Sequence, residues 1–119
     1  MTPVDLNFDN RKALLFALTS ERLGVYYEHD SWPDDHRALE TAQVWLMRQN
    51  VSAPPRLIRE LAALSGQFAR TLADSLSREA GLYMAHEMNQ SLDPNHQSPV
   101  AMDLLDECGR LLHEAQLAE

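Results

Sequence analysis

Apolar side chains recur every three or four residues over most of this 119-residue chain. A period near 3.6 residues collects apolar side chains on one face of an α-helix, and that face is then buried against other helices. The chain has four glycines, and no alternating stretch rich in β-branched residues interrupts the pattern. The spacing therefore predicts an all-α fold.

The first two predicted helices lie on either side of a break at Pro33. The first is expected to begin at Asp9 or Asn10, because either side chain can cap the free amides of a first turn. Gly24 could end this helix early. Pro33 disfavours helical geometry at the residue before it and suits a first turn, so the second helix is expected over residues 33–50.

The third predicted helix is the longest, and it runs from a cap at Ser52 to about residue 90. Gly66 could kink or divide it. The fourth helix is expected to open at Ser98, with Pro99 in its first turn, where a missing amide does least harm. Leucines at helical spacing follow Pro99 and predict a regular buried face.

Four helices with short connections predict a bundle of antiparallel neighbours with one long central helix. The bundle has five helices if the first or the third one divides, and the sequence leaves both points open. A chain of 119 residues fits a single domain, expected here over residues 1–119. Its hydrophobic fraction of 45% is enough to build a core.

The charge is acidic and unevenly distributed. The formal net charge is −8, and it is made up of −4 over residues 1–40, +1 over residues 41–92 and −5 over residues 93–119. Such a surface favours a basic protein partner over nucleic acid. The simpler interpretation is that the acidity only maintains solubility.

A single cysteine, Cys108, excludes an intramolecular disulfide and a cysteine-rich metal site. Its leucine neighbours at helical spacing predict a small buried residue rather than a reactive thiol. No apolar run approaches the roughly 20 residues that a membrane span needs, and the start of the chain lacks the pattern of a signal peptide. We therefore expect a cytoplasmic protein that does not bind membranes.

Two histidines and several carboxylates surround the break between the first two helices, and such side chains can ligate zinc, iron or manganese. A four-helix di-metal site also needs Glu-x-x-His pairs that face the core, and the chain has none. We favour exposed histidines beside an acidic helix start, with no metal and no cofactor, and keep a metal-binding helical bundle as an alternative. The cluster consists of Glu28, His29, Asp30, Asp34, Asp35, His36 and Glu40.

The second and third predicted helices could also form a helix-turn-helix, with Arg56 and Arg59 near the start of the helix that would enter the DNA groove. Two prolines occupy that start, however, and the whole protein is acidic. A surface without clustered cations gains little affinity from counterion release. DNA binding is therefore a second alternative, and we expect no nucleic-acid partner.

No catalytic motif is present. The sequence has no glycine-rich phosphate loop, no Gly-x-Ser-x-Gly and no His-Glu-x-x-His. The remaining histidines, His86, His96 and His113, have no partners at diagnostic spacing. We therefore expect a protein that is not an enzyme, with no catalytic residues.

The strongest indication of a partner lies late in the third predicted helix. Steps of roughly 100° place Leu82, Tyr83 and Met84 on different sides of that helix, and Met88 follows one turn later. A helix that is apolar all round is buried on several sides, either by its own neighbours or by another protein. Methionine also suits adaptable contact surfaces. These four residues form the predicted contact surface.

Tyr27 and Trp32 form a second candidate surface, because tyrosine and tryptophan are frequent interface anchors. Trp32 can equally fill the turn between the first two helices, and we favour that packing role.

These observations lead to the hypothesis of a non-enzymatic regulatory protein that binds another protein and inhibits or redirects it. Antiactivators, anti-defence inhibitors, immunity proteins and small adaptors belong to this class. The partner is expected to have a basic or apolar surface, and self-association as a homodimer through the third helix is a linked prediction.

Overall fold

The computed structural model describes residues 4–96 and 98–119, and this part of the chain is mainly helical with little strand, which confirms the all-α prediction. The first three residues, on which the expected lack of a signal peptide partly depends, lie outside the described residues. None of the described helices combines the length and apolar content that a membrane span needs. In chain order the described elements are β1 (Val4–Asp5), α1 (Phe8–His29), α2 (Asp35–Gln49), β2 (Val51–Ser52), α3 (Pro55–Ser75), α4 (Arg78–Gln90) and α5 (Pro99–Glu114).

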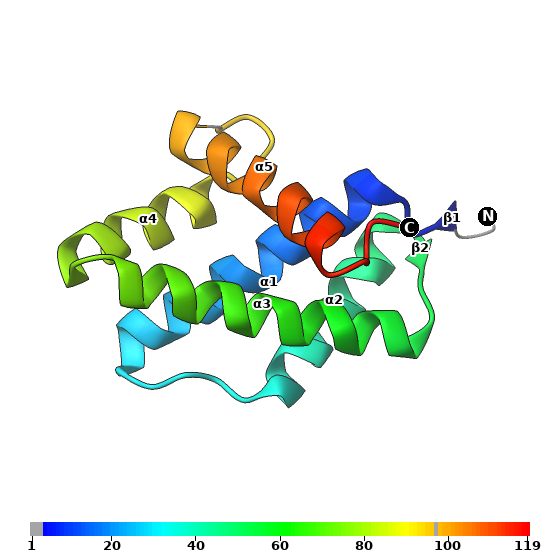
Figure 1. Cartoon of the computed structure of the whole chain (residues 1–119), viewed down its shortest axis with the longest axis horizontal. Helices are drawn as coiled ribbons and strands as arrows, with labels where there is room; N and C mark the ends of the chain where they lie inside the picture. The colour runs from blue at the N-terminus through cyan, green and yellow to red at the C-terminus, as the bar shows by residue number, and fades with distance from the viewer. Residues whose placement is uncertain (1–3, 97) are drawn as a thin grey trace.

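Helix α1 lies at the centre of the molecule, and the other four helices pack around it (Figure 1). All seven residues from 14 to 20 are buried, so the middle of this helix has little exposed surface on any side. Its cap is Asn7, whose side chain accepts from the amide of Asn10, so the expected caps at Asp9 and Asn10 were wrong. The helix continues through Gly24 and ends at His29, with Asp30 as its C-cap.

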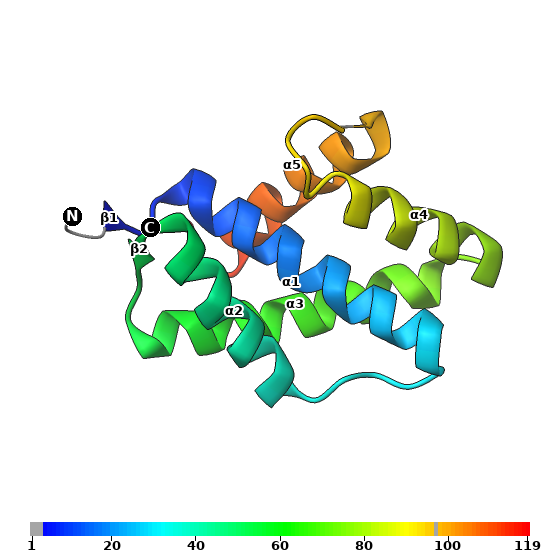
Figure 2. The same cartoon turned by 180° about the vertical axis from the view of Figure 1, so that it is seen from behind.

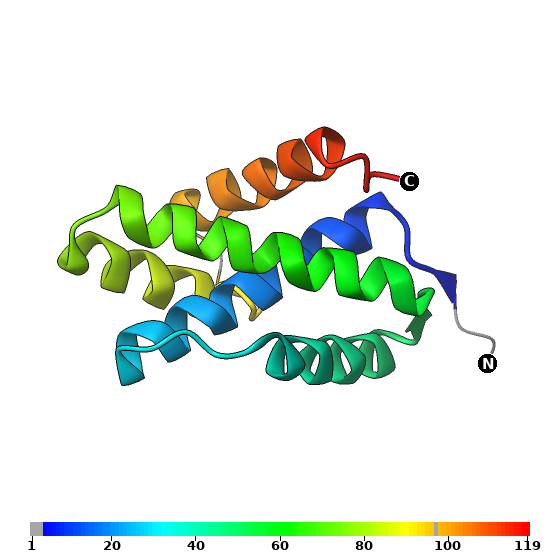
Figure 3. The same cartoon turned by 60° about the horizontal axis from the view of Figure 1, so that its bottom comes forward.

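The predicted long helix over residues 52–90 is in fact two helices. α3 ends at Ser75, Leu76 is extended, and the Ser77 Oγ accepts from the Ala80 amide at 3.2 Å to cap α4. Figure 3 shows the chain reversing direction at this point. The third helix therefore divides at residues 76–77 rather than at Gly66, and α1 is the longest and central helix instead.

Two short strands were not predicted. β1 and β2 pair in parallel, with Val4 opposite Val51 and Asp5 opposite Ser52. Ser52 consequently lies in a strand and does not cap α3, whose N-cap is Pro54. Each strand has two residues, which is too short for an alternating pattern to reveal.

The starts of α2 and α5 follow the capping rules. Asp34 caps α2, because its Oδ1 accepts from the Arg37 amide at 3.0 Å. Pro33 therefore precedes this helix instead of lying in its first turn. Ser98 caps α5 with Pro99 directly behind it, as predicted.

A buried arginine holds three helices together. The Arg22 guanidinium on α1 donates to Ser65 Oγ at 3.0 Å and to the Ala62 carbonyl at 3.1 Å, both on α3. It also donates to Asp35 Oδ1 at the start of α2, at 2.9 Å. A cation that is 2% exposed needs such partners to offset the loss of hydration. This network positions the start of α2 relative to α1 and α3.

Candidate functional site

An open groove runs along the outer face of α1. Figure 2 shows this face of α1 between α2 on one side and α4 on the other, and these two flanking helices do not pack against each other within the described residues. Three cavities of about 1030, 450 and 350 Å³ lie along it. The largest shares Glu21, Val25 and Asn89 with the second, and Trp45, Gln49 and Leu92 with the third. We call the three together the α1 groove.

Four of the α1 residues that line the α1 groove have small side chains and share one face of the helix. Ala13, Ala17, Ser20 and Gly24 line the groove at spacings of four, three and four residues, which is one face of a helix. A Cβ atom built on Gly24 would meet no atom within 4 Å. Glycine inside a helix lowers stability by about 0.5–1 kcal/mol relative to alanine. No neighbouring atom requires glycine at position 24, so folding does not explain its presence there.

Two buried hydroxyl groups at the groove have no hydrogen-bond partner. They are Ser20 Oγ and Ser91 Oγ, and no other described side chain has a buried nitrogen or oxygen atom in this condition. Ser20 is 3% exposed and lines the second cavity, and Ser91 lines the third. A buried hydroxyl without a partner costs roughly 1–3 kcal/mol. The α1 groove is therefore bordered by two buried hydroxyl groups that make no hydrogen bond within the described residues.

Exposed apolar side chains lie among the polar residues of the groove walls. Among the described residues seven large hydrophobic side chains are exposed, and four of them line the α1 groove. Trp45, half-buried, lies between the largest and the third cavity. An exposed apolar group of this kind, with polar residues around it, is typical of a contact surface. The four exposed side chains are Val44, Leu82, Leu92 and Met102.

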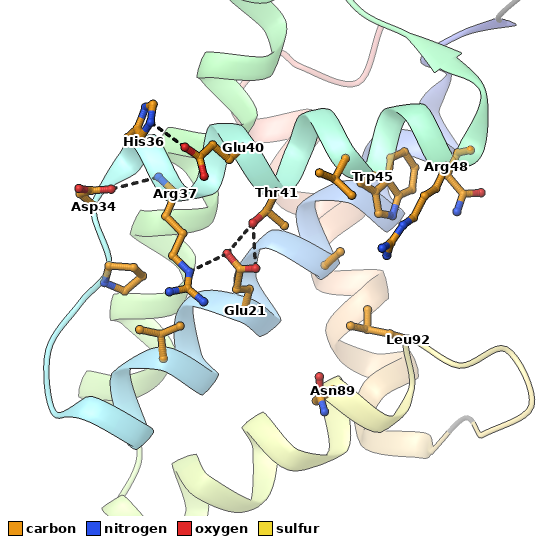
Figure 4. A pocket seen from close by; sticks show the side chains of 15 residues that line it. Glu21, Asp34, His36, Arg37, Glu40, Thr41, Trp45, Arg48, Asn89 and Leu92 are labelled. Atoms are coloured by element: carbon orange, nitrogen blue, oxygen red, sulfur yellow. Dashed lines mark hydrogen bonds and ion pairs between the residues drawn. The ribbon is translucent and has the colours of Figure 1, made fainter.

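A polar network links α1 and α2 along one side of the groove. Glu21 on α1 accepts from Thr41 Oγ1, at 2.7 and 2.8 Å from its two carboxylate oxygens, and Arg37 Nε lies 3.5 Å from it. Figure 4 shows these side chains on one side, with Asn89 and Leu92 across the open space. The network ties α2 to α1 without closing the groove.

The lining of the α1 groove is acidic. Five carboxylates and two guanidinium groups line the three cavities, which gives a net charge of −3 with histidine neutral. Asp106 has no ion-pair partner within the described residues, and Glu28 pairs there with His29 alone, at 3.9 Å. The carboxylates are Glu21, Glu28, Asp34, Glu40 and Asp106, and the guanidinium groups belong to Arg37 and Arg48.

The contact residues predicted on the third helix separate into two groups. Leu82 and Tyr83 are exposed on α4, at 43% and 57%, and Leu82 lies at one end of the α1 groove. A hydrogen bond with Glu87 raises the pKa of Tyr83. Met84 is half-buried and Met88 is fully buried, so the prediction that Met88 contacts a partner was wrong. The helix break turns Met88 into the core.

Tyr27 and Trp32, the second predicted surface, are mainly packed. Tyr27 is 8% exposed and meets α4 at Gly81, so it is a core residue rather than a free anchor, although it borders the second cavity. Trp32 stacks on Tyr26 with ring centres 4.1 Å apart, and the Arg70 guanidinium lies 5.7 Å from its ring centre. This stacking agrees with the packing role favoured for Trp32.

The acidic histidine cluster is spread over separate interactions. Asp34 caps α2, Asp35 pairs with Arg22, and His36 Nε2 lies 2.8 Å from Glu40 Oε1. In residues 4–96 and 98–119 no three histidine, cysteine or acidic side chains are close enough together to hold a metal ion. The metal-binding alternative therefore finds no site in this part of the chain.

The candidate DNA-reading residues do not form a cationic cluster. Arg56 and Arg59 are exposed near the start of α3, and Arg56 Nε lies 3.1 Å from Glu60 Oε1. This pairing reduces the positive charge that a phosphate backbone would meet.

Cys108 is fully buried, and burial raises the pKa of its thiol to about 12. The thiolate is the reactive form of cysteine, so the structure agrees with the inert thiol predicted from the sequence.

No family model, no curated protein and no solved structure matches this chain. The candidate site is therefore defined by its own geometry. Most of the groove residues were not among the predicted site residues, although the spacing of Ala13, Ala17, Ser20 and Gly24 is visible in the sequence. That spacing indicates a groove floor only because the opposite face of α1 forms the core.

Proposed function

We propose that this chain is a non-enzymatic regulatory protein that binds a segment of another protein in the α1 groove and thereby inhibits or redirects it. The proposal takes the five helices to form one cytoplasmic domain, a bundle built around α1. Antiactivators, anti-defence inhibitors, immunity proteins and adaptors remain the class to which it belongs.

The observation that carries the proposal is the position of the exposed apolar side chains. Val44 on α2, Leu82 and Leu92 at the two ends of the α4 region, and Met102 on α5 all line one groove although they are far apart in sequence. Burying such side chains contributes roughly 25 cal/mol per Å² of apolar surface, which supplies affinity for a partner. A groove open along one side suits a polypeptide segment better than an enclosed small molecule.

Affinity capture from native extract, with the purified chain as bait, tests the proposal. Val44→Asp and Met47→Asp form a matched pair, because both residues are exposed on α2 and only Val44 lines the groove. We expect a protein captured by the wild type and by Met47→Asp to be lost with Val44→Asp. The dissociation constant of that protein, once purified, should rise at least about tenfold in Val44→Asp, equivalent to about 1.4 kcal/mol.

Circular dichroism of both variants confirms that they are folded. Equal loss of the captured protein in both variants would contradict a role for the groove. If the chain captures no protein beyond those that an unrelated acidic protein also captures, the proposed function is contradicted.

Self-association through α4 remains a separate prediction, now placed on Tyr83, which is exposed and lines none of the three cavities of the groove. Sedimentation equilibrium should give a dimer for the wild type and a monomer for Tyr83→Asp. A monomer in both cases rejects the dimer and leaves the binding of another protein unaffected.

A further inference from the structure

We infer that the segment bound in the α1 groove is a cationic amphipathic α-helix of about 18 residues, and not a second copy of this chain. This inference rests on the proposed function and specifies the chemistry of its partner.

The length and floor of the groove fit a helix. The α1 residues that line it extend from Asn10 to Glu28, a distance of about 27 Å at 1.5 Å per residue. Helix axes approach to about 8–10 Å depending on the side chains between them, and small side chains allow the closer distance. Ala13, Ala17 and Gly24 provide such side chains at the spacing at which one helix meets another along its length.

The walls require one apolar face on the bound helix. Val44 and Trp45 stand on the α2 side, and Leu92, just after α4, and Met102, near the start of α5, stand across from them. Apolar residues at every third or fourth position of the bound helix would cover these four side chains together.

The acidic lining requires cations on the other face. The groove has a net charge of −3 within a chain of −8. Glu28 at one end and Asp106 at the other have no arginine or lysine partner within the described residues. A second copy would place one acidic groove against another acidic surface, and like charges at an interface are unfavourable. Lysine or arginine side chains complement this lining.

The test uses three fluorescently labelled synthetic peptides of 18 residues, measured by anisotropy against the whole chain. The first has a leucine and alanine face and a lysine face. The second has glutamate in place of each lysine, and the third has the composition of the first in an order that destroys the apolar face. We expect binding of the first peptide alone, weakened about tenfold or more between about 0.05 M and about 0.5 M salt.

Gly24→Leu separates docking in the groove from general attraction between a cationic peptide and an acidic protein. It fills the floor without changing any charge, and Gln43→Leu adds a leucine on the exposed α2 surface outside the three cavities. We expect binding of the lysine peptide to fall at least tenfold in Gly24→Leu and to remain unchanged in Gln43→Leu, with both variants folded by circular dichroism.

Several outcomes would overturn the inference. Equal binding of the glutamate peptide rejects the charge requirement, and equal binding of the reordered peptide or of Gly24→Leu rejects a helix in the groove. A wild-type dimer that Gly24→Leu dissociates identifies a second copy as the occupant. A natural partner captured through Val44 while all three peptides fail to bind would leave the proposed function intact and show that its partner is not a cationic helix.

Discussion

Gly81 and Gly24 both lie inside helices, but what surrounds each of them is very different. A Cβ atom built on Gly81 would lie 1.8 Å from the Tyr27 hydroxyl and 2.4 Å from Tyr27 Cζ, so α4 can approach α1 here only without a side chain. Gly24 faces the open groove, where nothing lies within 4 Å. One glycine is therefore required by packing, and the other leaves the groove floor flat.

Substitution of these two glycines by alanine is expected to change stability in opposite directions. Gly81→Ala should lower the free energy of unfolding by about 2 kcal/mol, because the added methyl group overpacks the contact with Tyr27. Gly24→Ala should raise it by up to about 1 kcal/mol, because alanine favours the helix and meets nothing. Urea denaturation followed by circular dichroism measures both. A stable Gly81→Ala variant would contradict the close approach of α4 to Tyr27.

The buried thiol predicts a dependence of stability on alkaline pH. Burial raises the pKa of Cys108 to about 12, so above about pH 9 the unfolded chain loses the thiol proton while the folded chain keeps it. The free energy of unfolding should therefore fall with rising pH, with a contribution from this thiol of about 1.4 kcal/mol per pH unit. Cys108→Ala should show a shallower slope between about pH 9 and about pH 10.5, whereas equal slopes would contradict the buried thiol.

At the scale of single elements, helix ends and the hydrogen bonds between helices determine how the helices are arranged. The break at residues 76–77 separates α3 from α4, and Arg22 fixes the start of α2 against α1 and α3. Together they position the two walls of the α1 groove on either side of its floor.

Ser77 and Ser75 offer a matched pair across the helix break. Ser77 Oγ caps α4, whereas Ser75 Oγ donates to the Thr71 carbonyl within α3. Ser77→Ala should lower the free energy of unfolding by about 1 kcal/mol, because an α4 amide loses its partner. Ser75→Ala should leave it unchanged within about 0.5 kcal/mol, since alanine is a better helix former and no cap is lost. Equal effects in urea denaturation would argue for a continuous helix.

The Arg22 tie is tested by removing its exposed carboxylate partner. Asp35→Ala deprives a buried guanidinium of a hydrogen bond of 2.9 Å, so the free energy of unfolding should fall by about 2 kcal/mol. Asp35→Asn retains a side-chain oxygen that can accept the same bond, and its loss should be smaller. Chemical denaturation of both variants at one pH measures the two free energies of unfolding. A decrease as large for Asp35→Asn as for Asp35→Ala would contradict the role of the hydrogen bond to Arg22.

At the scale of the whole molecule, α1 is the element on which the rest of the structure depends. It packs against each of the other four helices, and its middle has no exposed face other than the groove floor. Figure 1 and Figure 2 show it between the helices in both views. Local openings that expose α1 therefore require several helices to separate.

Native-state hydrogen exchange should show this hierarchy. Amides of residues 14–23 are expected to exchange most slowly, through global unfolding, because no single helix can leave and expose them. Amides of α2, which has three buried residues, should exchange faster through local opening. Slower exchange in α2 than in α1 would contradict a central α1.

The predictions made from the sequence succeed where the determining physics is local. The periodicity predicts helices, and Ser98 with Pro99 fixes the start of α5, because capping depends on residues within one turn. The same reasoning misses the cap at Ser77, since Leu72, Leu76, Ala80 and Met84 continue the apolar spacing across the break. It also treats Leu82, Tyr83, Met84 and Met88 as one surface, although the break turns Met88 inward and leaves Leu82 outside.

The sequence alone determined that this chain is helical, that it is acidic, and that it has enough apolar side chains to build a core. The tertiary structure decided which helix is central and which faces stay uncovered, including the alignment of Val44, Leu92 and Met102 along α1. The physical reason is that spacing records which side chains share a face of one helix, whereas a groove is formed by faces of several helices. Those faces are brought together by packing between residues that are distant in the chain.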